Sequence, residues 1–438
     1  MRLKRVVAVF LLVMPLVTGC GGDAVDDKEP LTKSVRTDAT QEKKDKVTPA
    51  PKPTPEDDKY VHGEDGYFNL DEAGVPVQLR AQSGGTCWLF AAAVSMETGY
   101  EIAHGKEIKI DPMKLLKPTY GEDKEEGYFL DGVGAREFGG VAPIVIHSLS
   151  NGFGFDGYVL DRGINLPDQN PETIKKYIKK YGAMYIGIPD GNAQKKAYFE
   201  GYTTLNFVTD DPKDYDHSIA IVGWDDHFPK KDFFDEASQD GAWITANSQA
   251  NSDYYYVSYD TKPDFMNDVP VFLSMTDEYT HVATHDCGYD EENPIKDKKG
   301  VTLANVFHDP GKLGAVGTYS IKKNQDIVIK VYDDKFKKCI YTQKEHLKDT
   351  GYQVIKLSEP IDVSDYAIAV TYTKGKAPVE GKYRKYDDGK IIFKPKSKKG
   401  ESFIKLGKKW YDLNDKNTGN IIGRKDKINN CCIKGLYV

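Results

Sequence analysis

The stretch Gln82-Ser83-Gly84-Gly85-Thr86-Cys87-Trp88-Leu89-Phe90-Ala91 joins a loop of small residues to a run of helix formers. Gly and Ser interrupt regular structure, whereas Leu89 and the alanines that follow favour a helix. Cys87 is therefore predicted in the first turn of a helix. The helix dipole and the free backbone N–H groups at that position favour a thiolate over a thiol. The stretch thus indicates a nucleophilic cysteine.

A nucleophilic cysteine needs a base and a group that orients the base, and two later segments supply candidates. His217 stands near the start of a β-like apolar run that ends at Gly223-Trp224, and Asn247 lies in a second short strand predicted at residues 241–248. His217 follows Cys87 by 130 positions and Asn247 follows it by 160. A similar order and spacing occurs in papain-like enzymes.

On these residues the chain resembles the papain-like cysteine peptidases. The matching pieces are residues 82–88, 216–224 and 247–248, in the order of that family. Phe138-Gly139-Gly140 before an apolar helical stretch, and a helix-turn-strand pattern at residues 174–188, are further similarities. The resemblance covers residues 67–259. It implies an α+β catalytic domain with a helical lobe and a β-barrel-like lobe, and no metal or cofactor.

The resemblance also implies a role for each matching residue. Cys87 is the expected nucleophile, which forms a thioester, and His217 is the expected general acid and base. Asn247 would orient the His217 ring. The Gln82 side chain and the Cys87 backbone N–H would form the oxyanion hole. Gly139-Gly140 would bind substrate by letting its backbone approach closely, because glycine has no Cβ.

Two features depart from the family pattern. The oxyanion glutamine usually precedes the cysteine by six positions, whereas Gln82 precedes Cys87 by five, so Gln78 competes with Gln82 for that role. The family has Asn-Ser-Trp-Gly, whose Trp shields the Asn–His hydrogen bond from water. This chain has Asn247-Ser248-Gln249-Ala250 instead.

The C-terminal half has a different periodicity. After residue 275 apolar residues alternate in short runs at 302–307, 313–319, 326–332 and 366–372, which predicts an all-β sandwich. Several of these runs, with the segments around Phe403, Trp410 and Cys432, resemble the lectin-like domain of bacterial surface members of the peptidase family. A wall polymer or glycan is therefore a candidate ligand. Trp410 is either a sugar platform or a core or edge Trp, and the Lys-rich residues 374–399 form a solvated arm or contact a polyanion.

The N-terminus is predicted to direct export. Basic residues precede the apolar run 6–17, which fits a signal peptide and is too short for a span of about 20 residues. Small residues before Cys20 resemble a lipobox, which implies a lipid anchor on Cys20. An ordinary secretory signal is the alternative. The segment 21–58 lacks aromatic residues and is rich in Lys, Asp and Pro, which predicts a disordered tether.

Net charge and cysteine content exclude two classes of protein. The 438 residues carry a net charge of −7, which excludes nucleic acid as the main partner. Six cysteines are too few for a disulfide scaffold, and Cys287, Cys339, Cys431 and Cys432 are left unassigned. His281, His285 and Cys287 do not have a spacing that predicts a metal site.

The predicted organisation is a lipoprotein signal at 1–20, a tether at 21–58, a papain-like domain at 59–275 and a lectin-like sandwich at 276–438. The predicted function is hydrolysis of peptides or proteins at a bacterial cell surface, with the chain held on the extracellular face of the membrane. Two alternatives remain open. One is an inactive papain-like scaffold that acts as a binding protein or adhesin, which the missing Trp favours. The other is a peptidoglycan amide hydrolase.

Overall fold

The computed structural model describes residues 65–121, 125–152, 156–189, 196–199, 202–209, 211, 215–249, 253–262, 269–290, 293–373, 375–386, 389–424 and 428–438. The predicted signal peptide, Cys20 and the tether lie outside the described residues. Within the described ranges, no helix is both long enough and apolar enough to cross a membrane.

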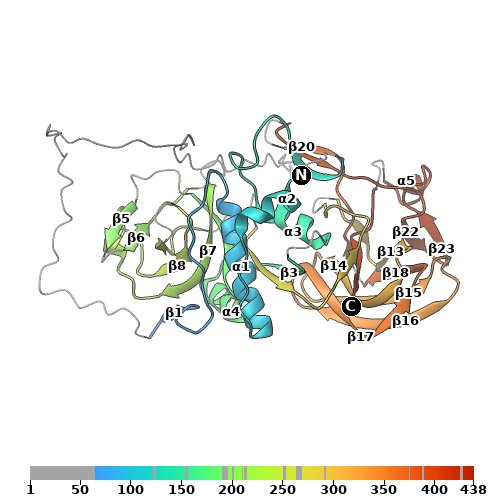
Figure 1. Ribbon diagram of the computed structural model, residues 1–438, viewed down its shortest axis with the longest axis horizontal. Helices are drawn as coiled ribbons and strands as arrows, with labels where there is room; N and C mark the ends of the chain where they lie inside the picture. Colours follow the sequence, from blue (N-terminus) through green and yellow to red (C-terminus); the bar gives the residue numbers. More distant parts are fainter. Residues whose placement is uncertain are drawn as a thin grey trace, which may run out of the picture.

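Helix α1 (Cys87–His104) is the longest helix of the described chain and lies at the centre of the molecule (Figure 1). It is buried from Cys87 through Tyr100, as expected for a helix that is apolar on nearly all sides. It ends at His104 and is capped by Gly105, whose φ of 64° is the left-handed conformation that glycine adopts easily. The helix packs against strands β7 (Tyr215–Asp225) and β10 (Val271–Thr276).

The other helices are shorter. Helix α4 (Pro171–Tyr181) is amphipathic and buries Ile174, Ile178 and Tyr181. Its start is fixed by the Asn170 side chain, which accepts a hydrogen bond from the Glu172 N–H. The remaining helices are η1 (Pro112–Leu115), α2 (Leu116–Thr119), α3 (Ala142–Ser150), η4 (Lys230–Asp232) and α5 (Thr418–Ile421).

The largest sheet has thirteen strands and runs through both halves of the chain in the order β11-β24-β14-β17-β3-β10-β4-β7-β8-β9-β6-β5, with β1 paired to β7. Its other strands are β1 (Tyr67–Asn69), β3 (Val159–Asn165), β4 (Met184–Pro189), β5 (Lys196–Phe199), β6 (Tyr202–Leu205), β8 (Ala242–Ala246), β9 (Tyr254–Ser258), β11 (His281–Ala283), β14 (Gly311–Ser320), β17 (Gly351–Val363) and β24 (Ile433–Tyr437).

Strands β17 and β3 join the two halves. They pair antiparallel, with Gly351 opposite Ile164. Gly351 has a φ of 109°, and a Cβ there would collide with the Gly163 carbonyl oxygen, so this junction requires glycine. The predicted boundary between residues 275 and 276 falls at the end of β10, and strands on both sides of it belong to one sheet.

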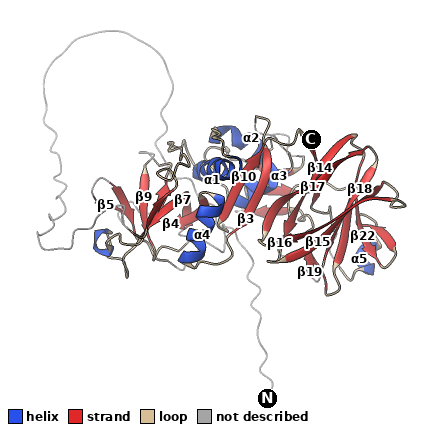
Figure 2. Ribbon diagram, turned by 90° about the horizontal axis from the view of Figure 1, so that it is seen from below, coloured by secondary structure: helices blue, strands red, loops and turns tan. Residues whose placement is uncertain are grey.

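A second sheet of six strands lies in the C-terminal half, in the order β16-β15-β18-β13-β22-β23 (Figure 2). Its strands are β13 (Val301–Phe307), β15 (Gln325–Asp333), β16 (Cys339–Leu347), β18 (Tyr366–Tyr372), β22 (Ser402–Leu406) and β23 (Lys409–Asp412). Leu303, Ile329 and Ile368 of this sheet share a core with Leu313 and Ile433 of the large sheet. Strands therefore occur at the positions where the two-fold periodicity predicted them.

Two small sheets complete the fold. Strand β2 (Gly127–Leu130) pairs with β21 (Ile391–Lys394), which pairs with β20 (Arg384–Tyr386). Strand β12 (Ile295–Asp297) pairs with β19 (Gly375–Ala377). The Lys-rich segment 374–399 thus contains three strands, and one of them binds the N-terminal half.

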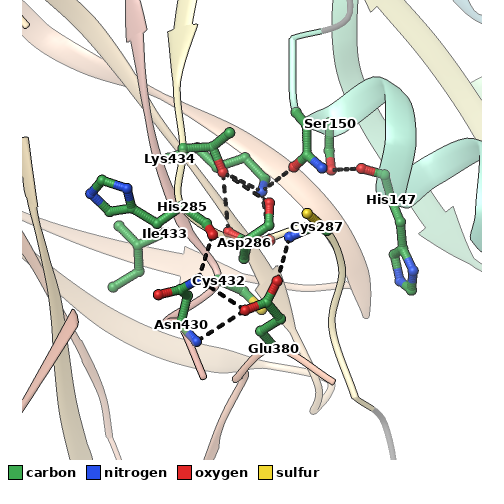
Figure 3. Close-up of polar contacts among 12 residues, drawn as sticks. His147, Ser150, His285, Asp286, Cys287, Glu380, Asn430, Cys432, Ile433 and Lys434 are labelled. Atoms are coloured by element: carbon green, nitrogen blue, oxygen red, sulfur yellow. Dashed lines mark hydrogen bonds and ion pairs between the residues drawn. The ribbon is translucent and has the colours of Figure 1, made fainter. Parts of the chain in front are cut away.

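A buried polar cluster also links the halves (Figure 3). The Lys434 ammonium group is fully buried and donates to Asn151 Oδ1 at 2.8 Å, Thr284 Oγ1 at 3.1 Å and Asp286 Oδ2 at 2.7 Å. Asn151 directly follows helix α3, whereas Lys434 lies on the last strand. Burial and the Lys434 charge lower the pKa of the neighbouring His147 to about 3, so this histidine is neutral near pH 7.

Candidate active site

Cys87 is the first residue of α1 and is fully buried. The loop before it is held against the backbone of Arg136, because the Gly85 N–H donates to the Arg136 carbonyl oxygen at 2.7 Å. Gly84 has a φ of 70°, and a Cβ there would collide with the same carbonyl oxygen. The small residues of the loop therefore allow the close approach that fixes the start of the helix.

His217 and Asn247 lie side by side on paired strands. His217 belongs to β7, Asn247 directly follows β8, and the register of the pair places Ala220 opposite Ala246. His217 Nε2 and Asn247 Oδ1 are 2.7 Å apart, and both residues are buried. The Asn247 backbone N–H donates to the Asp253 carbonyl oxygen at 3.1 Å, which holds the segment after β8 in place.

Helix α1 brings Cys87 to the same region. The helix packs against β7, the strand of His217. A small cavity of about 10 Å³ is lined by Phe90 and Ala91 of α1 together with Asn247 and Ser248. The structure therefore gathers the segments that carry the predicted nucleophile, base and orienting residue.

Of the two competing glutamines, Gln82 is the one bound to the Asn247-Ser248 segment. Its backbone N–H donates to the Ser248 carbonyl oxygen at 2.7 Å, and its Oε1 accepts from Ser248 Oγ at 2.8 Å. Gln82 Nε2 donates to the Gly84 carbonyl oxygen at 2.7 Å, which uses one of the two amide protons. Gln78 instead donates to Glu107 Oε1 in an exposed contact.

Gly139 and Gly140 have a packing role that the sequence did not indicate. The Gly139 carbonyl oxygen accepts a buried hydrogen bond from the Tyr120 hydroxyl at 2.7 Å. A Cβ on Gly140 would lie 2.6 Å from the Trp88 ring, far inside van der Waals contact. The lack of a side chain at Gly140 is thus required by the residue next to Cys87, whatever the pair does for substrate.

Gly140→Ala is expected to lower the free energy of unfolding by about 1–3 kcal/mol, as overpacking does in other cores. Urea denaturation would measure the loss, and Trp fluorescence would report displacement of Trp88. The double variant Gly140→Ala/Trp88→Phe should recover part of the stability, because the smaller ring makes room. A fully stable Gly140→Ala protein would contradict the packing role.

Gln249 stands where the papain-like pattern has Trp. Its backbone N–H donates to Asn247 Oδ1 at 3.4 Å, and its side-chain Oε1 accepts from the Tyr255 hydroxyl at 3.1 Å. Asn247 Nδ2 is buried and has no hydrogen-bond partner within the described part of the chain. A polar amide thus replaces the apolar shield beside the His217–Asn247 contact.

Sequence reasoning missed the groups that fix this site from a distance. The Tyr120 hydroxyl, the Arg136 carbonyl oxygen and the Asp253 carbonyl oxygen each bind a predicted residue or its neighbour. Tyr120 is 19 positions from Gly139, and Arg136 is 51 positions from Gly85. No local sequence pattern marks either residue.

The other thiols differ from Cys87. Burial raises the pKa of Cys431 to about 12 and raises the pKa values of Cys287 and Cys432 well above the usual range of a thiol, which keeps all three protonated near pH 7. Cys339 is exposed. Within the described ranges no group of three His, Cys, Asp or Glu side chains is arranged to hold a metal ion.

Comparison with known proteins identifies the fold. A family model described as "Lectin like domain" matches residues 283–436, and no curated protein sequence matches the chain. A structure of Cwp84, a clostridial cysteine protease, after propeptide cleavage superposes with a TM-score of 0.67 at 17% identity over 84% of this chain and 98% of that chain. A structure of the cysteine protease and lectin-like domains of Cwp84, a surface layer associated protein of Clostridium difficile, gives 0.65 at 17% identity over 85% and 88%.

These likenesses cover both halves of the chain and nearly the whole length of the solved structures. The family model independently matches the C-terminal half. The predicted resemblance is therefore confirmed at the level of fold: the chain has the architecture of a papain-like cysteine peptidase domain followed by a lectin-like domain.

Proposed function

We propose that this protein is a cysteine peptidase in which Cys87 is the nucleophile, His217 the general acid and base, and Asn247 the residue that orients His217. The contact of 2.7 Å between His217 Nε2 and Asn247 Oδ1 carries the proposal, because an amide oxygen beside the ring fixes both its tautomer and its direction. The fold shared with a cysteine protease supports it.

The chemistry follows from this arrangement. Asn247 Oδ1 accepts the proton on Nε2, so Nδ1 is the nitrogen that takes the Cys87 proton. The thiolate attacks the peptide carbonyl carbon, and the imidazolium then protonates the leaving amine. Water, activated by the neutral ring, hydrolyses the thioester. The N-terminus of α1 favours the thiolate, because the helix dipole is positive there.

Gln82 and the Cys87 backbone N–H are proposed to bind the oxyanion. The bonds from Gln82 to Gly84 and Ser248 hold its amide in one orientation, which is what a preorganised donor requires. Loss of one oxyanion donor typically costs about 10²–10³ in rate. Gly139 and Gly140 are proposed to line the substrate path in addition to packing on Tyr120 and Trp88.

The proposed location is the bacterial cell surface. The N-terminal pattern that predicts export and lipid attachment at Cys20 supports it, and Cwp84 is described as a surface layer associated protein. The proposed catalytic body comprises the helical and β-barrel-like lobes at residues 59–275, and the proposed substrates are peptides or proteins.

A non-catalytic scaffold is a second candidate, which Gln249 favours. With a polar amide where the family has Trp, water can approach the His217–Asn247 contact more easily and weaken it. Such a protein would keep the fold and bind a surface polymer or host protein without turnover.

A peptidyl epoxide, which alkylates the thiolate of papain-like enzymes, separates these candidates. We expect one adduct per chain, located at Cys87 by mass spectrometry, and a labelling rate that falls at least about 100-fold in His217→Ala, because the base that generates the thiolate is lost. Cys339→Ala, which removes the exposed thiol, should label like the parent. No adduct at Cys87, together with no hydrolysis of a peptide library, would establish the scaffold instead.

A further inference from the structure

Four half-buried aromatic side chains gather on the six-stranded sheet. We call them the aromatic patch: Tyr332 on β15, Phe336 in the turn after β15, Phe403 on β22 and Trp410 on β23. The strands that carry them lie at the far end of the molecule from β5 and β6 (Figure 1).

The rings of the aromatic patch are in direct contact. Phe336 stacks on Trp410 with ring centroids 4.2 Å apart and an angle of 20° between the planes. Phe336 also meets Phe403 edge-on at 5.2 Å, and Tyr332 meets Trp410 edge-on at 6.3 Å. Lys405 Nζ lies 5.4 Å from the centre of the Trp410 ring.

The aromatic patch faces away from the core of the lectin-like half. Val331 and Ile404 pack into that core, and successive side chains of a strand point to opposite faces. Their neighbours Tyr332 and Phe403 therefore point outward. The core of the sandwich is formed by the inner face of the sheet, so these large rings lie outside that core.

Phe336 is held over Trp410 at a conformational cost. Its φ of 57° is in the left-handed region, which a bulky residue seldom adopts. The turn is fixed by Asp333, whose two carboxylate oxygens accept from the Lys337 N–H at 2.7 Å and the Lys338 N–H at 3.0 Å. Glycine or asparagine would adopt this left-handed conformation more easily, which indicates that the Phe336 ring has a role of its own.

Positive charge surrounds the aromatic patch. Residues 330–338 and 402–412 contain seven lysines and three aspartates. The carboxylates of Asp333 and Asp412 are bound to backbone N–H groups. Among the described residues, no acidic side chain lies within ion-pair distance of three exposed lysines, Lys337, Lys338 and Lys409.

We propose that the aromatic patch and its surrounding lysines bind an anionic polysaccharide. The C–H groups of a sugar ring would pack against the accessible part of the Phe336–Trp410 pair, and the carboxylate or phosphate groups of the polymer would pair with Lys337, Lys338 and Lys409. The site is separate from Cys87 and does not depend on catalysis.

Two observations favour a polysaccharide over single-stranded nucleic acid, which also combines stacking with negative charge. The chain carries a net charge of −7, whereas nucleic-acid binding usually uses an extended basic face. The predicted export of the chain also places it among wall polymers.

Affinity electrophoresis of the full chain tests the proposal. The gels contain polygalacturonate as a carboxylate polymer, phosphomannan as a phosphate polymer, dextran as a neutral polymer, or no polymer, and oligo-dT is titrated separately. We expect retardation by one or both anionic polysaccharides at low salt, with loss of retardation as salt screens the charges. Which of the two binds identifies the anionic group.

Matched variants locate the surface. Trp410→Ala should weaken binding about 10-fold, the typical effect of losing one stacked ring. Lys337→Gln/Lys338→Gln/Lys409→Gln should weaken it by a similar factor and flatten its salt dependence. Lys296→Gln/Lys298→Gln/Lys299→Gln, which changes three exposed lysines around β12, should bind like the parent. If Trp410→Ala unfolds, Phe336→Gly removes the stacked ring while relieving the turn.

The proposal is overturned if neither anionic polysaccharide retards the parent chain, or if dextran retards it equally. It is also overturned if oligo-dT binds more tightly than both polymers, which would assign the surface to nucleic acid. Folded patch variants that bind like the parent would show that the rings only cover the buried outer-face alanines Ala304 and Ala369.

Discussion

Cys87→Ala is expected to lower kcat/KM for peptide hydrolysis by about 10⁴–10⁶-fold, because the thioester route requires the sulfur atom of Cys87. Only binding and the oxyanion donors would remain to assist water. Hydrolysis of a fluorogenic peptide library by the parent and the variant measures the loss.

The double variant Cys87→Ala/His217→Ala gives a sharper result. Residues that act as one catalytic unit are not additive, so the double variant should lose about as much activity as either single variant. Losses that multiply would mean that the two residues act independently, and would contradict the proposed pair.

Two controls separate chemistry from folding. Cys339→Ala removes the exposed thiol and should keep full activity. Cys87→Ala removes one sulfur atom from a buried position, so its free energy of unfolding should fall by only about 1–2 kcal/mol. Retained hydrolysis in a folded Cys87→Ala protein would refute the proposed nucleophile.

The parts of the candidate site that the sequence predicted are those marked by local pattern. Helix α1 begins at Cys87, as the change from small residues to helix formers predicted. His217 lies in a β-strand, as its apolar run predicted. The second predicted strand, residues 241–248, ends at Ala246 in the structure, so Asn247 follows the strand instead of lying in it. Hydrophobic periodicity and turn-forming residues are local signals that extend over a few positions, so they can be read from a single sequence.

The parts that the sequence did not predict depend on contacts between distant segments. The pairing of β17 with β3, which makes one sheet of both halves, depends on a register between residues almost two hundred positions apart. The motif predicts that Gly139-Gly140 binds substrate, and that stays a prediction; the collision of a Gly140 Cβ with the Trp88 ring is a separate requirement for glycine that no motif marks. Such reasons appear only when the packing is known.

The environment of Trp410 also depends on contacts that the sequence does not predict. The sequence left a sugar platform and a core or edge position as alternatives. Trp410 lies on β23, the edge strand of the six-stranded sheet, and its side chain is on the outer face. Phe336, which stacks on the Trp410 ring, comes from a turn that no hydropathy pattern marks. The turn conformation at Phe336 depends on the Asp333 carboxylate, which the sequence alone does not reveal.

Lys434→Met is expected to lower the free energy of unfolding by about 3–5 kcal/mol, because it leaves Asp286 as an uncompensated buried charge. The side chains of both residues are fully buried and 2.7 Å apart. The double variant Lys434→Met/Asp286→Leu should recover most of the loss, since replacing a buried pair by apolar residues is often neutral. Urea denaturation of the three proteins measures these differences.

An exposed pair is the matched control. Lys356 Nζ and Glu278 Oε2 are also 2.7 Å apart, but both side chains are exposed, so Lys356→Met should cost less than about 1 kcal/mol. Equal costs at Lys356 and Lys434 would contradict the role of burial.

The Lys434 variant also tests whether the two halves unfold together. Lys434 lies on β24 of the lectin-like half, and its partner Asn151 follows α3, the helix that begins two residues after Gly140. Since one sheet continues through both halves, loss of this link should destabilise the peptidase body as well. Loss of peptide hydrolysis and loss of the C-terminal fold should therefore occur at the same urea concentration. Two separate transitions would show that the shared sheet does not couple them.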